Sequence, residues 1–277
     1  MGKLTGKIAF VTGAGSGLGR EIARVFAAEG ARVAVNDLRT DSAAAIHQEL
    51  SRRNAALGEP FVGDVADSAV VAGWFASLDE AGGGQLDILV NNAGYADADA
   101  ETQRRIGVQL QEIQSTGKIT TALDATARLS DESWQRMLAV HLNGTFYCTR
   151  EALGRMAPRR QGRIISMASI AGLTGIASVP HYSAAKAAII GFTKAVARDV
   201  APHGILVNAI APGYIDTPIL DVLGDQRAMQ TTLLAAQTPL GRLGEAREIA
   251  STALFLASDA SSYFTGQVLS PNGGMVI

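Results

Sequence analysis

A tyrosine and a lysine four positions apart, Tyr182 and Lys186, begin a helical segment that follows Pro180. Residues i and i+4 of an α-helix share one face, so we expect the two side chains to lie together. A lysine ammonium close to a phenol favours the phenolate and lowers the tyrosine pKa from about 10. Such a tyrosine could act as a general acid or base near neutral pH.

A serine that could assist this tyrosine lies thirteen residues earlier. Ser169 follows the apolar run 163–166, and its hydroxyl could hydrogen-bond the oxygen of a carbonyl or alcohol substrate. His181, directly before Tyr182, could also contact a substrate, although a lone histidine often only fills a core. Together these side chains predict proton transfer at a substrate oxygen.

A glycine-rich turn follows the first apolar run, residues 8–11, and reads TGAGSGLG from Thr12 to Gly19. Glycines let a backbone approach a pyrophosphate, and free N–H groups at the start of the next helix can hold the anion. The turn therefore predicts a dinucleotide site. Its predicted contact residues are Gly13, Ser16, Gly17, Leu18 and Gly19.

An aspartate ends the second apolar run and indicates which dinucleotide is bound. Asp37 could accept hydrogen bonds from the ribose hydroxyls of NAD and would repel the extra phosphate of NADP. Leu38 follows it and is also predicted to line the cofactor site. Arg39 could tolerate a phosphate weakly, so NADP is the less favoured cofactor; a simple turn-forming role for Asp37 is the alternative.

The elements that must position these residues alternate along the chain. Longer segments with apolar residues every three or four positions separate the short apolar runs, which indicates helices between strands. This order predicts an α/β fold, a parallel sheet covered on both faces, in one domain spanning residues 1–277. The predicted strands are 8–11, 32–35, 88–90, 163–166 and 206–210, and the predicted helices are 19–29, 42–53, 68–80, 131–155 and 182–201.

A polar stretch from about residue 95 to 129 interrupts the alternation. Within it, Ile106, Leu110 and Ile113 form one stripe of an amphipathic helix. Long insertions in such folds often serve as lids over a site. A surface excursion without a role is the alternative.

Composition excludes several classes of protein. The 277 residues carry a net charge of −2, which gives no basic field for nucleic acid or anionic lipid. No apolar run is long enough to span a bilayer, and the N-terminus lacks the apolar core of a signal peptide. Cys148 is the only cysteine. We therefore expect a cytoplasmic protein with no nucleic-acid, membrane or metal site.

Taken together, the motifs resemble those of the short-chain dehydrogenase/reductase family. The family's TGxxxGxG, NNAG and YxxxK motifs correspond to Thr12–Gly19, Asn91–Gly94 and Tyr182–Lys186, and its Pro-Gly to Pro212-Gly213. The resemblance covers most of the chain except residues 95–129. It implies a doubly wound Rossmann-type sheet of about seven strands, NAD(P) binding, hydride transfer and a homotetramer or homodimer.

The resemblance also assigns roles to single residues. Ser169 would stabilise the substrate, Tyr182 would be the acid/base, and Lys186 would lower the tyrosine pKa and hold the nicotinamide ribose. The family pattern VDGG reads Pro271-Asn272-Gly273-Gly274 here, which we expect to affect packing or assembly only. Further cofactor contacts implied by the resemblance are Asp64, Val65, Asn91, Ala93, Gly94, Pro212, Gly213, Ile215 and Thr217.

The stretch AVHLNGTF, residues 139–146, departs from the family's NLxGxF. Relatives place the asparagine of a catalytic tetrad about 28 residues before the serine, and His141 occupies that position here. An imidazole can also donate or accept a hydrogen bond. We expect His141 to take the fourth catalytic place; packing at a subunit interface is the alternative.

The expected reaction interconverts a secondary alcohol and a ketone, with NAD as the cofactor. A 3-oxoacyl thioester substrate and a non-catalytic dinucleotide-binding regulator are the alternatives. An S-adenosylmethionine methyltransferase would not need the serine, tyrosine and lysine, and a sugar-nucleotide epimerase would need a separate substrate domain after Pro212. A hydrophobic or alicyclic substrate is expected because the candidate pocket walls are apolar: Leu173, Ile176, Val179, Ile219, Leu220, Val222 and Leu223.

Overall fold

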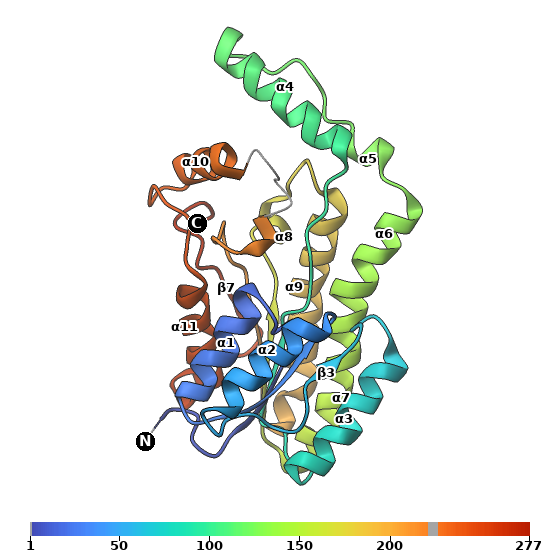
Figure 1. Ribbon diagram of the computed structural model, residues 1–277, viewed down its shortest axis with the longest axis vertical. Coiled ribbons are helices and arrows are strands. Elements are labelled where there is room, and N and C mark those ends of the chain that lie inside the picture. The colour runs from blue at the N-terminus through green and yellow to red at the C-terminus, as the bar shows by residue number, and fades with distance from the viewer. Residues whose placement is uncertain (1, 221–226) are drawn as a thin grey trace.

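The computed structural model of the protein describes residues 2–220 and 227–277 (Figure 1). Seven parallel strands form one sheet in the order β3-β2-β1-β4-β5-β6-β7. This confirms the predicted doubly wound α/β fold. The strands are β1 (Ile8–Val11), β2 (Arg32–Asp37), β3 (Phe61–Val62), β4 (Ile88–Asn91), β5 (Gly162–Met167), β6 (Ile205–Ile210) and β7 (Val268–Leu269).

Helices cover both faces of the sheet because successive side chains of each strand point to opposite faces. In β1, Ala9 and Val11 pack in a cluster with α1, α2 and α11, whereas Ile8 and Phe10 pack in a second cluster with α3, α7 and α9. These helices are α1 (Gly17–Ala28), α2 (Thr40–Ser51), α3 (Ser68–Gly82), α7 (Gly144–Arg159), α9 (Pro180–Val200) and α11 (Ala246–Ala257). Among the residues described, no helix is long and apolar enough to cross a membrane.

The helix predicted over 131–155 is divided by a change of winding. The chain runs from α6 (Asp131–Leu138) through a π-helical turn, Ala139–Asn143, into α7. A π-helical turn places one extra residue in the turn and commonly occurs at functional sites. His141 lies at the centre of this one. Apolar periodicity does not reveal such a local change, because the flanking helical faces still carry apolar residues.

The insertion forms α4 (Ala100–Thr116) and the short α5 (Ala125–Arg128), and α4 extends away from the body of the molecule (Figure 1). The predicted stripe lies on α4 as expected, although Ile113 remains 47% exposed. The carboxylate of Asp99 caps the helix by accepting the N–H of Thr102 at 2.9 Å. The insertion is therefore an ordered arm, and its base adjoins the start of α9.

Candidate active site

The carboxyl ends of β1, β4 and β5 carry two of the predicted motifs and Ser169 to one edge of the sheet. The glycine turn follows β1, Asn91–Gly94 ends β4, and Ser169 follows β5. The chain reverses its direction of strand addition between β1 and β4, and ligands of open α/β sheets bind at such a point. The topology therefore collects the candidate residues in one place.

The glycine turn has no room for side chains at two of the predicted contact positions. A Cβ on Gly13, which has φ +61°, would lie 2.7 Å from Cα of Ala93, and one on Gly19 would lie 2.3 Å from the carbonyl oxygen of Gly13. Real Cβ atoms do not approach so closely. The turn thus presents bare backbone and the N-terminus of α1, which is suitable for a pyrophosphate.

Two side chains that the motif pattern alone does not single out hold this turn against β4. The amide of Asn92 donates to the carbonyl oxygens of Thr12 and Gly13, both at 3.0 Å. The hydroxyl of Thr12 accepts the N–H groups of Asn92 (3.0 Å) and Ala93 (3.1 Å). Both residues lie inside the predicted motifs, which are therefore the signal for them, but only the structure separates supporting from contacting positions.

Asp37 is buried at the tip of β2, beside the turn. One oxygen of its carboxylate accepts the N–H of Gly15 at 2.9 Å, and the other accepts the N–H of Arg39 at 3.0 Å. Leu38 is 62% exposed at the same edge. The bare turn and the carboxylate at its side together fit the pyrophosphate and ribose of a dinucleotide.

The other predicted cofactor residues lie along the same edge with varied local contacts. Asp64 pairs with Arg136 at 2.6 Å. The side chain of Asn91 points into the sheet, where it donates to the hydroxyls of Thr149 (3.0 Å) and Ser166 (3.3 Å). Its Oδ1 has no hydrogen-bond partner among the described residues, and a cofactor contact of Asn91 stays a prediction.

The Pro-Gly segment after β6 completes this edge. Thr217 is buried opposite Gly17, where an added Cβ would lie 3.6 Å from Cβ of Thr217. Gly213 packs against Asn272, leaving 2.8 Å between a Cβ there and Cα of Asn272. The departure from VDGG thus bears directly on the packing of the Pro-Gly turn. Pro212 and Ile215 are buried in the same segment. Val65, another predicted contact, packs against Gly144.

Tyr182 and Lys186 share one face of α9, as their spacing predicts. Nζ of Lys186 lies 5.5 Å from the centre of the Tyr182 ring and donates to the carbonyl oxygen of Met167 at 2.6 Å. Ser169 is hydrogen-bonded to the phenol of Tyr182, which lowers the tyrosine pKa. All three predicted side chains are therefore brought together.

The electrostatics of this pair differ from the sequence prediction. Burial raises the pKa of Tyr182 more than the Ser169 hydrogen bond lowers it. Burial also lowers the pKa of Lys186 to about 7. We expected Lys186 to lower the pKa of Tyr182. In the protein without a bound cofactor it does not, because both groups are desolvated and the Lys186 ammonium donates to the carbonyl oxygen of Met167.

His141 lies against Tyr182, with the two ring centroids 5.4 Å apart in an edge-to-face arrangement. The imidazole is only 1% exposed within a single chain, which contradicts the alternative of packing at a subunit interface. Its Nε2 lies 2.9 Å from the carbonyl oxygen of Tyr95, and a Cβ on Gly94 would lie 2.3 Å from its Cε1. Burial holds its pKa well below the usual range.

The chain is similar to known proteins over nearly its whole length. The family model of short chain dehydrogenases matches residues 7–228. The chain belongs to the short-chain dehydrogenase family. It is 38% identical to 3-oxoacyl-[acyl-carrier-protein] reductase FabG of Escherichia coli (strain K12) over 270 residues, which cover 98% of this chain and 97% of the relative.

Two further matches extend over nearly the whole chain. Subunit BbsD of the (2S)-[(R)-hydroxy(phenyl)methyl]succinyl-CoA dehydrogenase of Thauera aromatica is 39% identical over 269 residues, covering 97% of this chain and 96% of the relative. A crystal structure from Agrobacterium tumefaciens, provisionally assigned as a gluconate dehydrogenase, superposes with a TM-score of 0.84 at 33% identity and covers 99% of this chain and 98% of that one. This short-chain dehydrogenase is therefore an oxidoreductase that uses a nicotinamide dinucleotide.

Proposed function

We propose that the protein is an NAD-dependent oxidoreductase that interconverts a secondary alcohol and a ketone. The observation that carries this proposal is the convergence of Ser169, Tyr182 and Lys186 beside the bare glycine turn. A non-catalytic regulator would bind the dinucleotide through the turn alone. It would not require a hydroxyl, a phenol and a buried ammonium around one point.

The side chains divide the proton chemistry in the direction of ketone reduction. The phenol of Tyr182, protonated at neutral pH because burial raises its pKa, gives its proton to the substrate oxygen as negative charge develops there. The hydroxyl of Ser169 holds the same oxygen and stabilises the phenolate that remains. A nicotinamide dinucleotide bound at the turn supplies the hydride. Lys186 contributes positive charge below pH about 7 and a polar anchor at the cofactor side.

The choice of NAD rests on Asp37. Its carboxylate is fixed by the N–H groups of Gly15 and Arg39 at the position where an adenosine ribose would lie. A 2′-phosphate there would meet a buried negative charge. Arg39 donates its backbone N–H to Asp37 and not its guanidinium. This hydrogen bond therefore does not neutralise the charge of the carboxylate.

The reacting group is a secondary alcohol or ketone on an apolar substrate. Around the site, Val179 is buried, Ile176 and Leu220 are half-buried, and Leu173 and Ile219 are both 40% exposed. Two of the predicted wall residues, Val222 and Leu223, lie outside the described residues. Apolar walls are suited to an alicyclic body.

A 3-oxoacyl thioester is the second candidate substrate, because two relatives are named for acyl-carrier-protein and CoA thioesters. Their names describe those proteins, and this chain differs from the family pattern at His141. Comparing acetoacetyl-CoA reduction with cyclohexanone reduction separates the two candidates.

The test is a steady-state measurement of kcat/KM for secondary alcohols and ketones with each cofactor, followed by cofactor absorbance. We expect turnover with NAD exceeding that with NADP, and a loss of about a thousandfold or more in Tyr182→Phe. Tyr263→Phe is the matched control because Tyr263 is fully exposed. Undiminished activity in Tyr182→Phe would contradict the mechanism, and a preference for NADP would contradict the role of Asp37.

A further inference from the structure

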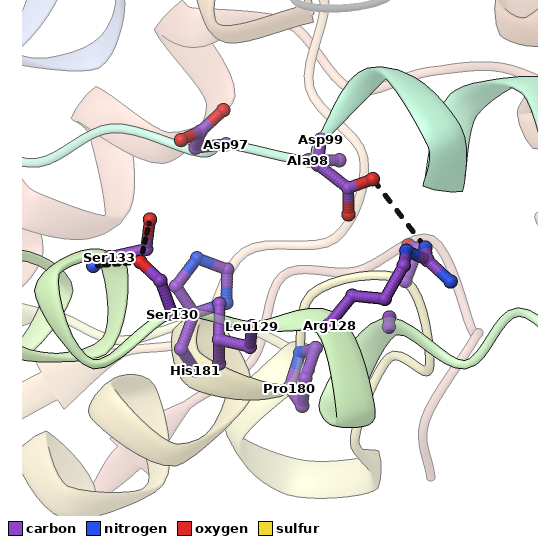
Figure 2. A pocket seen from close by; sticks show the side chains of 11 residues that line it. Asp97, Ala98, Asp99, Arg128, Leu129, Ser130, Ser133, Pro180 and His181 are labelled. Atoms are coloured by element: carbon purple, nitrogen blue, oxygen red, sulfur yellow. Dashed lines mark hydrogen bonds and ion pairs between the residues drawn. The ribbon is translucent and has the colours of Figure 1, made fainter.

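A pocket of about 120 Å³ lies where the base of the insertion meets the start of α9 (Figure 2). Three parts of the chain line it: the loop leading into α4, the α5–α6 connection, and the segment ending in His181. The pocket belongs neither to the glycine turn nor to the apolar walls. His181 lines it and acts electrostatically on His141, whose ring packs against that of Tyr182, so the pocket adjoins the active site.

His181 is the pocket residue closest to the chemistry. Its side chain is only 4% exposed, and its Nδ1 is buried without a hydrogen-bond partner among the described residues. A positive charge on His181 would lower the pKa of His141, so the two imidazoles are electrostatically within reach of each other. A polar atom buried without a partner costs about 1–3 kcal/mol. His181 therefore has one ring nitrogen whose hydrogen bond no described residue supplies.

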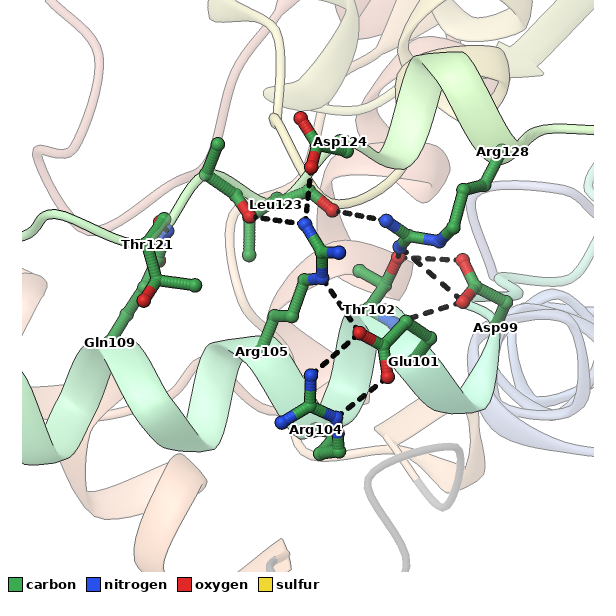
Figure 3. Close-up of polar contacts among 11 residues, drawn as sticks. Asp99, Glu101, Thr102, Arg104, Arg105, Gln109, Thr121, Leu123, Asp124 and Arg128 are labelled. Atoms are coloured by element: carbon green, nitrogen blue, oxygen red, sulfur yellow. Dashed lines mark hydrogen bonds and ion pairs between the residues drawn. The ribbon is translucent and has the colours of Figure 1, made fainter.

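Most other polar groups of the pocket are engaged in holding the insertion together (Figure 3). Arg128 donates to the carbonyl oxygen of Leu123 at 2.7 Å and to the hydroxyl of Thr102 at 2.6 Å. Asp99 accepts from the hydroxyl of Thr102 at 2.6 Å. These contacts fix the outer wall of the pocket relative to α4.

Further along the arm, a second set of contacts joins α4 to the loop that returns from it, residues 117–124. Arg105 pairs with Glu101 at 2.7 Å and with Asp124, and Gln109 donates to the carbonyl oxygen of Thr121 at 2.7 Å (Figure 3). These contacts hold the insertion together, so its base forms an ordered wall of the pocket.

Asp97 differs from these residues, because no hydrogen bond holds its carboxylate in the described part of the chain. Burial lowers the pKa of His181 more than the Asp97 carboxylate raises it, so the imidazole is neutral at neutral pH. A neutral imidazole offers one donor and one acceptor, and a carboxylate offers acceptors only. The pocket therefore presents both kinds of partner at once.

A hydroxyl group is complementary to this set, since it can donate to Asp97 or Nδ1 and accept from an imidazole N–H. An anionic group would meet the carboxylates of Asp97 and Asp99. A purely apolar group would leave Nδ1 of His181 unpaired. We propose that the pocket is a substrate subsite for a second hydroxyl group, so that the favoured substrate is a hydroxylated alicyclic alcohol. This inference rests on the proposed function.

The experiment compares cyclohexanol with cyclohexane-1,2-diol, 1,3-diol and 1,4-diol as substrates of the full-length enzyme with NAD⁺. We expect kcat/KM for at least one diol to exceed that for cyclohexanol by about tenfold or more, because a site built to hydrogen-bond a hydroxyl rejects the analogue that lacks it. The positional series locates the subsite relative to the reacting carbon. A greater preference for 4-aminocyclohexanol than for any diol would overturn the hydroxyl assignment in favour of a cation.

Variants then assign the preference to the pocket. His181→Phe keeps a ring and removes both nitrogens, and Asp97→Asn changes only an exposed residue. Both should reduce the diol preference to about threefold or less, and Asp97→Asn should leave cyclohexanol turnover little changed. Asp199→Asn, at the far end of α9 and also exposed, is the matched control and should keep the preference. Because Asp97 is on the surface, its variant tests the subsite even where His181→Phe does not fold.

The outcomes separate the subsite from the proposed function. Equal kcat/KM for cyclohexanol and all three diols overturns the subsite and leaves the function standing. A diol preference that survives both His181→Phe and Asp97→Asn also overturns it. An enzyme that turns over none of the four alcohols, and none of the other secondary alcohols and ketones tested, loses the proposed function. The subsite is then judged by calorimetry of diol binding to the NADH complex: binding weakened tenfold in Asp97→Asn supports it, and no binding overturns it.

Discussion

Lys186 gives a prediction in which stability and activity move in opposite directions. Burial lowers its pKa from 10.5 to about 7. Between these values the unfolded chain binds a proton that the folded chain does not, so the free energy of unfolding rises with pH across this window. Below pH about 7 the folded protein carries the full penalty of a buried ammonium.

The size of the effect follows from the shift. At pH 7 a difference of this size corresponds to about 4 kcal/mol of destabilisation. Lys186→Met removes the charge, but it leaves the carbonyl oxygen of Met167 without its donor, which costs about 1–3 kcal/mol. We therefore expect the variant to be inactive yet more stable than the wild type by roughly 1–3 kcal/mol at pH 7.

Urea unfolding at pH 7.5 and pH 9, at one protein concentration, measures the difference in the free energy of unfolding between Lys186→Met and the wild type. The stability advantage of Lys186→Met should shrink by about 2 kcal/mol over that interval, because only the wild type gains stability as the pH rises. Lys194→Met is the matched control, since Lys194 is exposed on the same helix. A difference between Lys186→Met and wild type that is the same at both pH values would refute the reasoning.

Two further substitutions test the cofactor edge and the fourth catalytic place. Asp37→Ser removes the buried carboxylate and should shift the ratio of kcat/KM for NAD⁺ to that for NADP⁺ towards NADP⁺ by about tenfold or more, measured by cofactor absorbance. Gly94→Ala places a Cβ against His141 and should lower kcat by at least about tenfold; the double variant with His141→Asn should recover part of that loss if the clash is the cause, whereas an additive loss would contradict it. If kcat of His141→Asn and of His141→Ala both equal that of the wild type across pH 6 to 9, the His141 side chain is dispensable.

The sequence predicts the sheet well where strands are long enough to show a pattern. The four-residue run Ile8–Val11 alternates between two clusters and is recognisable, whereas β3 and β7 have two residues each and lie among turns. Such short strands form only by pairing with a neighbouring strand: β3 pairs with the end of β2, and β7 with the end of β6. No local signal encodes such pairing.

The candidate site shows the same division between local and tertiary information. Spacing places Tyr182 and Lys186 on one face, and the chain topology brings Ser169 to them. The direction of the Lys186 ammonium and the burial of Tyr182 depend on residues far away in sequence, and these reverse the predicted pKa of the tyrosine. Likewise His181 and Asp97 line one pocket only when the insertion folds back to the start of α9.

The charges around Tyr182 follow from one physical condition, the exclusion of water. Burial lowers the pKa of both His141 and His181, so each imidazole is neutral at neutral pH and offers a hydrogen bond without a charge. Lys186 is the one basic group of this cluster that still titrates near neutrality. A histidine in the fourth catalytic place therefore need not act as a second acid or base. It can replace an asparagine because burial makes it, like asparagine, a neutral donor and acceptor.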